Sequence, residues 1–477
     1  MEKLRFPTLL LGLFTLTVQA ETIVPAEWAK TFDITFSGYA GEETLTDFPA
    51  LVRLNTSTIA NFSYDDFLAK DANGVPADLR FTDAIGTVLD YEIDTWNAEG
   101  ESLIWVRVPT LTKTTKISAY YGRINATAQV NESTVWKDYI GVWHLNGNLD
   151  DATPHKLNGE QKGWSATDAS RLGKAYAGAR QNGNGIQTPS FDSVKAKDAK
   201  ILTLSGWFCP SASGDNEKDA RFFCRKTAYG NANGLDVAYK NGYLWVRGAN
   251  TGTSVGATGT AGWVYDYAMT AGEWTHLTVV INDMDVHVFY NGVEQEAIQS
   301  AGFQPITANG LQLAFANYAR GDTALSKFAG RAYFGGTIDE TRAYDGALSA
   351  DRATAEYATM APDSTFASYG AADAPVTDVI VVVTGVAGEA TQTGFTAAGM
   401  VFSLGGQASV AVEVEYGVDE DHLTRVPLAT ATEPGRVSTA VTGLLPNTTY
   451  LWRVRAGEVT GDFAEVTTLP GEATFGR

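Results

Sequence analysis

The stretch "WTHLTVVINDMDVHVFYNGVEQEA", residues 274–297, decides the fold class of this chain. Apolar residues occupy alternate positions from Leu277 to Ile281 and again from Val286 to Tyr290, with the polar turn "NDMD" between the two runs. A period of two is the pattern of half-buried strands, and the Asn-Gly pair that follows favours a tight hairpin turn. The stretch therefore predicts an antiparallel β-meander.

The same Asn-Gly turn signal recurs along the middle of the chain, in "LDVAYKNGYLWVRG" (235–248) and "ITANGLQLAFA" (306–316). The chain of 477 residues contains 48 Gly, 20 Tyr, 22 Phe and 11 Trp, a composition that favours strands and turns over helices. The predicted fold class is all-β, with several β-sandwiches in one chain.

Turn spacing and composition divide the chain into three blocks, which agrees with a prior of roughly 100 to 200 residues per domain. We expect a signal peptide at 1–20, an N-terminal β-sandwich at 21–132 and a larger sandwich at 133–366. An Ala/Pro/Ser/Asp-rich linker is expected at 367–375, followed by an immunoglobulin-like sandwich at 376–470.

The N-terminus combines Lys3 and Arg5 with an apolar run from Leu9 to Leu16 and a small-residue "VQA" before Glu21. This is the pattern of a secretory signal peptide, and it is too short for a spanning helix. No cysteine follows the run, so we expect no lipid anchor, and no later stretch is long and apolar enough to cross a membrane. We expect a secreted, periplasmic or bacterial cell-surface protein.

The formal net charge is −20, and the sequence pI is near 4.7. Nucleic acids and anionic membranes would be repelled by such a chain. Glycans, cations and other surface proteins are the expected partners, although acidity also serves the solubility of secreted proteins.

Two adjacent carboxylates, Asp339 and Glu340, lie in "GGTIDETRAYDGAL", residues 335–348. Neighbouring side chains of a regular strand point to opposite faces, so the two are not expected to flank one scissile glycosidic bond. Glu340 would share a face with Arg342, which would neutralise it.

The chain carries no Gly-x-Ser-x-Gly elbow, no His-Glu-x-x-His helix and no metal-spaced Cys/His cluster. Glu413 and Glu415 alternate with apolar residues in the last block, and we expect both to be solvated. We therefore expect that the protein is not an enzyme.

Trp263, Tyr265 and Tyr267 alternate in "GATGTAGWVYDYAMTAGEW", residues 256–274, and would share one strand face. Aromatic faces stack on sugar rings, and Asp266 would hydrogen-bond to sugar hydroxyls, so these four residues form a candidate ligand site. The alternative is that the aromatic side chains turn into the core of the sandwich.

The two cysteines, Cys209 in "LSGWFCP" and Cys224 in "RFFCRKT", lie in aromatic runs separated by a polar, turn-rich segment. If the runs form an antiparallel pair, the sulfurs lie opposite each other, and a disulfide is expected outside the cytoplasm. The alternative is two buried thiols.

The middle block resembles the laminin-G-like jelly rolls of the concanavalin A-like superfamily, through "YIGVWHLNGNLDDATPHKLNG", "LTLSGWF", "EWTHLTVVINDMDVHVFYNG" and "FGGTIDETRAYDGALSADRATAEYA". The last block is similar to a fibronectin type III domain in "VEYGVD" and "LLPNTTYLWRVRA". The first block, with "FPALVRLN", "SLIWVRVPTL" and "ISAYYG", is similar to a bacterial domain of unknown function that often precedes such jelly rolls.

The jelly-roll resemblance implies a structural calcium ion, for which the matching positions are Asp150, Asp151 and Asp339. Calcium takes several oxygen ligands, as carboxylates and backbone carbonyls supply. The turn "DDATPHKLNG" departs from the family's shorter form, which leaves the individual ligands open. The alternative is that Asp339 is a hydrogen-bonded structural residue.

The resemblances together imply a secreted or cell-surface, non-catalytic protein that binds carbohydrate or mediates adhesion. Two alternatives stay open. One is an accessory binding subunit of a polysaccharide-degrading system. The other is a structural surface-layer or matrix protein that acts through protein contacts.

Overall fold

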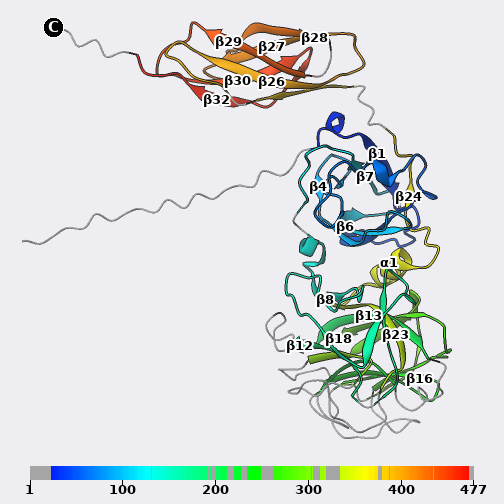
Figure 1. Cartoon of the computed structure of the whole chain (residues 1–477). Coiled ribbons are helices and arrows are strands. Elements are labelled where there is room, and N and C mark those ends of the chain that lie inside the picture. Colours follow the sequence, from blue (N-terminus) through cyan, green and yellow to red (C-terminus); the bar gives the residue numbers. More distant parts are fainter. Residues whose placement is uncertain are drawn as a thin grey trace, which may run out of the picture.

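The computed structural model describes residues 23–129, 132–181, 183–190, 194, 200–211, 220–226, 234–248, 262–301, 303, 312–317, 333–373, 379–385, 387–432 and 435–471. The expected signal peptide lies outside the described residues. Within them the protein is all-β, as predicted, with α1 as the single α-helix (Figure 1). Among these residues no helix is long and apolar enough to span a bilayer.

The N-terminal domain is a sandwich of two sheets, ordered β24-β1-β7-β3-β4 and β2-β6-β5. Its strands are β1 (Lys30–Thr35), β2 (Leu45–Leu54), β3 (Arg80–Thr82), β4 (Val88–Leu89), β5 (Tyr91–Thr95), β6 (Ser102–Leu111), β7 (Lys116–Tyr121) and β24 (Ser368–Tyr369). Short 3-10 turns are η1 (Pro25–Glu27), η2 (Tyr64–Asp66) and η3 (Glu132–Trp136). Apolar side chains of both sheets, among them Phe32 and Val106, form one core.

The central domain is a jelly roll of two eight-stranded sheets. The first sheet contains β8 (Tyr139–Trp143), β10 (Trp164–Thr167), β11 (Ala175–Gly178), β13 (Ile201–Pro210), β18 (Thr275–Asn282), β19 (Asp285–Tyr290), β20 (Val293–Glu294) and β23 (Gly336–Tyr344). The second contains β9 (Glu160–Lys162), β12 (Gly185–Ser190), β14 (Ala220–Lys226), β15 (Gly234–Lys240), β16 (Tyr243–Arg247), β17 (Gly262–Asp266), β21 (Ala297–Ala301) and β22 (Gln312–Phe315).

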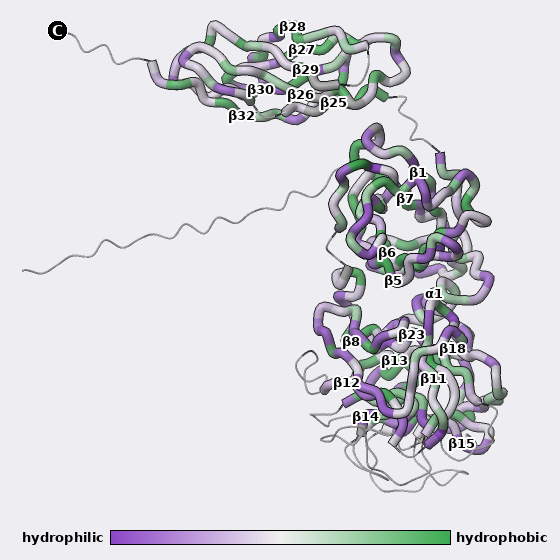
Figure 2. The backbone as a smooth tube through the Cα atoms, in the orientation of Figure 1, coloured by the Kyte–Doolittle hydropathy of each residue, from purple (hydrophilic) through white to green (hydrophobic). Residues whose placement is uncertain are grey.

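The predicted meander is confirmed, since β18 and β19 pair antiparallel with Ile281 opposite Val286 and Val279 opposite Val288. All four side chains lie in the core between the two sheets. Figure 2 shows hydrophobic segments along the strands that enclose this core.

The C-terminal domain is a separate sandwich of two sheets, β25-β26-β29 and β28-β27-β30-β31 with β32 beside β30. Its strands are β25 (Ile380–Thr384), β26 (Gly394–Leu404), β27 (Val410–Gly417), β28 (Thr424–Ala431), β29 (Gly435–Thr442), β30 (Thr449–Ala456), β31 (Val459–Thr460) and β32 (Ala464–Thr467). The hydroxyl of Tyr450 accepts a hydrogen bond from the Leu445 N–H at 3.0 Å. This side chain thus returns to the backbone a few residues upstream, as in the tyrosine corner of Greek-key sandwiches.

Glu415, expected in solvent, is instead buried on β27. Its carboxylate accepts hydrogen bonds from Arg425 at 2.9 Å, Arg453 at 2.8 Å and Arg455 at 3.4 Å. Three guanidinium groups from neighbouring strands offset the free-energy cost of burying the Glu415 carboxylate. The alternation of residues along one strand does not reveal such partners on other strands.

The helix α1 (Ala350–Met360) follows the jelly roll and packs on the N-terminal domain. Ser349 caps it, because its hydroxyl accepts a hydrogen bond from the Arg352 N–H. Ala355 belongs to the N-terminal core, and the Thr359 hydroxyl accepts a hydrogen bond from the Leu51 N–H at 2.9 Å.

Residues 367–373, expected to belong to a linker at 367–375, belong instead to the N-terminal domain. β24 pairs with β1, and Ala372 is fully buried in the N-terminal core. Asp373 bridges to Thr31 on β1. The chain therefore returns to complete the first domain after the jelly roll, and only residues 374–378, which lie outside the described part, precede the third domain.

The first two domains share a hydrophobic cluster of their own. Leu51, Leu103 and Trp105 of the N-terminal sandwich pack with Trp136 of η3 and with Trp207 of the jelly roll. Together with α1, this cluster joins the two sandwiches through an apolar contact. A polar cluster lies beside it and forms the candidate site.

Candidate functional site

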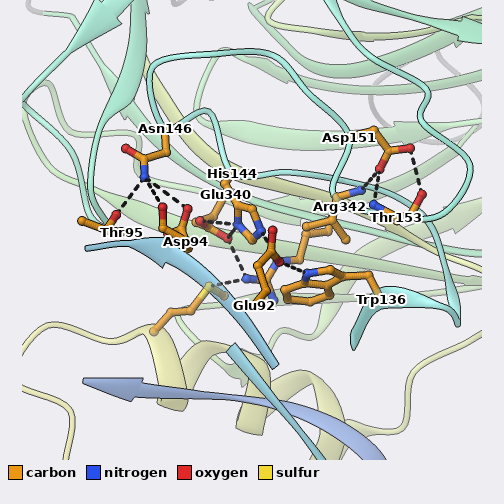
Figure 3. Close-up of polar contacts among 12 residues, drawn as sticks. Glu92, Asp94, Thr95, Trp136, His144, Asn146, Asp151, Thr153, Glu340 and Arg342 are labelled. Carbon is orange, nitrogen blue, oxygen red and sulfur yellow. Dashed lines mark hydrogen bonds and ion pairs between the residues drawn. The ribbon is translucent and has the colours of Figure 1, made fainter. Parts of the chain in front are cut away.

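The candidate site is a group of carboxylates around one imidazole at the contact between the first two domains (Figure 3). Glu92 and Asp94 come from β5 of the N-terminal sandwich. His144 follows β8 of the jelly roll, and Glu340 lies on β23. We call these four residues the interdomain cluster.

The strand β23 contains a β-bulge at Glu340. Asp339 pairs with Trp207 and Arg342 with Ser205, so two residues of β23 face Gly206 alone. Glu340 has φ of +48°, which fits the bulge. Ile338 and Ala343, five residues apart, both enter the sandwich core, which a regular strand would not allow.

The bulge overturns the prediction that Asp339 and Glu340 point to opposite faces. Both carboxylates lie on the side of the sheet that faces the N-terminal domain, and Arg342 lies there too. The predicted pairing of Glu340 with Arg342 is confirmed, with an Arg342 Nη2 to Glu340 Oε2 distance of 2.7 Å. Both carboxylates are fully buried and hydrogen-bonded, so they do not line an open cleft.

Asp94 is also the extra residue of a bulge. On β5, Ile93 pairs with Ile104 and Thr95 with Leu103, which leaves Asp94 without a partner in the ladder. The amide of Asn146 donates to Asp94 Oδ1 at 3.2 Å and to Thr95 Oγ1 at 2.8 Å. Each domain therefore re-aims one carboxylate toward the contact by means of a bulge.

His144 has a carboxylate at each ring nitrogen. Its Nδ1 lies 2.8 Å from Glu340 Oε1, and its Nε2 lies 3.3 Å from Glu92 Oε2. Glu92 also accepts a hydrogen bond from the Trp136 indole. The imidazole thus connects the two domains directly.

The loop before β11 closes tightly on this contact at Gly173, which has φ of +51°. A Cβ at Gly173 would lie 2.7 Å from Thr95 Oγ1 and 2.8 Å from Asn146 Oδ1. Glycine is therefore required here both by the backbone conformation and by the space.

Arg342 is the guanidinium of the site and is fully buried. It lies 4.4 Å from the ring centroid of Trp105 and 4.9 Å from that of Trp136. Aromatic faces attract such a cation, which offsets part of its desolvation.

The charged groups at the site shift one another's pKa values. Burial alone would lower the pKa of His144, but the carboxylates of Glu340, Asp94 and Glu92 raise it well above its usual value. Burial would raise the pKa of Glu340, but His144 and Arg342 lower it. Burial raises the pKa of Asp94 to about 7, although His144 opposes the shift.

Asp339, a predicted calcium ligand, is a buried structural residue in this fold. Its Oδ2 accepts hydrogen bonds from the Arg171 N–H at 2.8 Å and the Leu172 N–H at 3.0 Å. Burial, with Glu340 nearby, raises its pKa well above the usual value.

Asp151 organises the turn after β8. Both of its oxygens accept hydrogen bonds, from the N–H group of Val142 on β8 and, within the turn, from the N–H groups of Thr153 and Leu157 and the Thr153 hydroxyl. Asp150 is exposed, and Asn158 donates to it. Donors directed at Asp151 compete with a cation there, so calcium at Asp150, Asp151 and Asp339 stays a prediction without support from this geometry.

The predicted aromatic ligand site is a core element. Trp263, Tyr265 and Tyr267 do share one face of the chain, but that face packs against the sandwich core, with Tyr265 and Tyr267 buried. The Tyr265 hydroxyl donates to the Val286 carbonyl, and the Trp263 indole donates to the Met284 carbonyl. Asp266 points away and is exposed. The alternative of inward aromatics is therefore correct.

The predicted disulfide is absent, although both cysteines are described. Cys209 lies on β13 of the first jelly-roll sheet, and Cys224 lies on β14 of the second. Their neighbours Phe208 and Phe223 fill the core, so the two thiols lie on the outer faces of opposite sheets, where Cys224 is buried and Cys209 is partly buried.

A hollow of about 570 Å³ lies on the outer side of the first jelly-roll sheet. Small residues line it, among them Gly178, Cys209 and Thr337. Trp274 is two residues beyond the lining residue Gly272, and the Arg171 guanidinium lies 5.6 Å from its ring centroid. Burial raises the pKa of the Cys209 thiol, and the guanidinium of Arg171 opposes this shift.

Sequence reasoning missed the interdomain cluster. Asp94 and Glu92 occupy an ordinary acidic strand, and His144 is a strand-end histidine with no spacing motif. The one available signal was the unusual adjacency of Asp339 and Glu340. The rule of regular alternation wrongly placed the two carboxylates on opposite faces of the strand.

Two families match parts of the chain. Residues 180–353 match the Concanavalin A-like lectin/glucanases superfamily, and residues 75–165 match a Domain of unknown function (DUF2341). The two predicted resemblances of the first and middle blocks are thereby confirmed, whereas the fibronectin type III resemblance stays a prediction. The second match contains both Asp94 and His144.

Several solved structures are similar in part. Domain 4 of AbnA, a GH43 extracellular arabinanase from Geobacillus stearothermophilus solved with arabinotriose, is 21% identical, with 45% of this chain and 96% of that chain covered and a TM-score of 0.32. The sensor domain of the anti-sigma factor RsgI4 of Pseudobacteroides cellulosolvens is 19% identical, covering 21% and 98%, with a TM-score of 0.17. The binding domain of Paraclostridial Mosquitocidal Protein 1 is 11% identical, covering 67% and 75%, with a TM-score of 0.35. No curated protein matches the chain.

Proposed function

We propose that the protein is a secreted or cell-surface carbohydrate-binding protein without catalytic activity, and that its jelly roll binds the glycan. The match of residues 180–353 to the concanavalin A-like lectin/glucanase superfamily supports the binding class. The acidic chain, with its formal net charge of −20, favours neutral over anionic glycans. The pattern at residues 1–20 supports export.

The observation that carries this proposal is the hollow on the first jelly-roll sheet. Its volume of about 570 Å³ falls within the roughly 300–1,000 Å³ typical of small-ligand sites. A Cβ at the lining residue Gly272 would meet no atom within 4 Å, so the backbone is open to a sugar ring there, and the Thr337 hydroxyl provides a hydrogen-bonding group.

The non-catalytic part of the proposal rests on the carboxylates. In retaining and inverting glycosidases two carboxyl groups flank the scissile bond across a cleft that admits the sugar. Asp339 and Glu340 are fully buried, and no carboxylate is among the described residues that line the hollow.

The test is binding of the full chain without residues 1–20 to a broad glycan array, followed by titration of the best glycan. Thr337→Trp and Ala177→Trp each place a large side chain in the hollow, so each should weaken binding at least tenfold. Lys240→Trp, at an exposed hairpin of the other sheet, is the matched control and should bind as the wild type does.

The same glycan, incubated with the protein, should release no new reducing ends. Release of products would overturn the non-catalytic part alone. Absence of glycan binding would overturn the carbohydrate-binding part, and self-association of the intact chain in that case would favour a structural surface protein.

A further inference from the structure

We propose that Asp94, His144 and Glu340 bind a divalent transition-metal cation, of which Zn²⁺ is the representative, and that this metal joins the N-terminal sandwich to the jelly roll. One ligand atom from each of the three residues lies within 4.8 Å of the other two. The three residues come from different strands or loops of two domains, so only the assembled pair of domains creates the site.

The first supporting feature is an unpartnered oxygen. Asp94 Oδ2 is shielded from solvent and has no hydrogen-bond partner, although Asn146 satisfies Oδ1. The Asp94 residue as a whole is only partly buried, but this atom is not exposed. A buried carboxylate oxygen without a donor costs free energy, which a cation at this place would recover.

The second feature is the backbone. Asp94 and Glu340 both occupy β-bulges, and the two bulges belong to different domains. Bulges re-aim side chains and are frequent beside functional sites. Two independent bulges here direct carboxylates toward the same imidazole.

The third feature is the carboxylate behind the imidazole. The Nδ1 of His144 faces Glu340, whereas its Nε2 faces Glu92, which is itself held by the Trp136 indole. A metal-binding histidine characteristically donates its other ring N–H to a carboxylate, which fixes the tautomer and the ring orientation. Glu92 is thus the positioning residue that leaves Nδ1 for the metal.

The type of donor atom selects the cation. The imidazole of His144 and the carboxylates of Asp94 and Glu340 supply the donor atoms. One imidazole nitrogen with two carboxylates suits Zn²⁺ and its neighbours, whereas Ca²⁺ and Mg²⁺ prefer oxygen ligands alone.

The test uses the tag-free full chain without residues 1–20, loaded with Zn²⁺, freed of excess metal by gel filtration and assayed for bound zinc by mass spectrometry. We expect about one zinc per chain and a higher melting temperature with Zn²⁺ than with chelator. Asp94→Asn and His144→Gln should abolish retention, and Glu92→Gln should weaken it by about 10- to 100-fold.

Asp94→Asn is nearly isosteric and removes one of several crowded negative charges, so it should melt, without metal, no lower than the wild type. This separates loss of the site from loss of the fold. His287→Gln is the matched control, because His287 and Glu294 form an exposed pair at 2.6 Å outside the cluster, and it should retain zinc. No zinc on the wild type, or equal zinc on Asp94→Asn, would overturn the proposal.

Discussion

Glu92 of the N-terminal sandwich lies 3.3 Å from the Nε2 of His144 in the jelly-roll block, across the boundary between two domains. The contact is enclosed by the tryptophans of the shared hydrophobic cluster, and Arg342 lies on two of them. The two domains therefore meet through a buried, charged contact rather than a flexible joint. We expect them to unfold together.

Arg342→Met should lower the free energy of unfolding by about 3–5 kcal/mol, because Glu340 would keep a buried charge without its guanidinium. Chemical denaturation followed by tryptophan fluorescence measures this change. Lys113→Met is the control, since Lys113 and Glu42 form an exposed pair whose loss should cost under about 1 kcal/mol. Equal effects of the two substitutions would contradict a buried role for Arg342.

His276 should make the protein sensitive to acid. Burial lowers its pKa to about 3, below the usual 6.5, so the folded state keeps the imidazole neutral. Below pH 6.5 the imidazole of His276 becomes protonated in the unfolded chain, whereas in the folded chain it becomes protonated only at about pH 3. Stability from this residue is therefore complete above pH 6.5 and falls by up to about 1.4 kcal/mol per pH unit within that window.

His276→Leu should remove this part of the acid slope, as measured by denaturation at a series of pH values from 7 to 4. His155→Gln, which changes an exposed loop histidine, should leave the slope as it is. A slope that His276→Leu does not change would show that another group carries the acid sensitivity.

The two cysteines should remain thiols. Because Cys209 and Cys224 lie on the outer faces of opposite sheets, an intramolecular disulfide would require the sandwich to unfold. We expect about two thiols per chain on titration in denaturant without reductant, and a melting temperature that reductant does not change. A titre near zero in a monomeric sample would refute the observed placement of these strands.

Tyr265→Phe should lower the free energy of unfolding by about 0.5–1.5 kcal/mol, because the hydrogen bond from its hydroxyl to the Val286 carbonyl is lost. Tyr265→Ala should cost about 3–5 kcal/mol, as expected for a large side chain in the core. Asp266→Asn, at the exposed neighbouring position, should stay within about 0.5 kcal/mol of the wild type. If Tyr265→Ala weakens glycan binding while stability is unchanged, the residue belongs to a ligand surface after all.

The sequence by itself determined the strands, the meander of β18 and β19, the cap of α1 and the return of Tyr450 to the backbone. These features depend on alternation, turn residues and contacts within a few positions, and such local rules act wherever a chain is placed. The tertiary structure decided the rest. Asp94, His144 and Glu340 meet only because two domains pack together, and bulges at Asp94 and Glu340 break the period on which strand faces are read. The same holds for Cys209 and Cys224, whose separation follows from the assignment of β13 and β14 to different sheets, which no local pattern encodes.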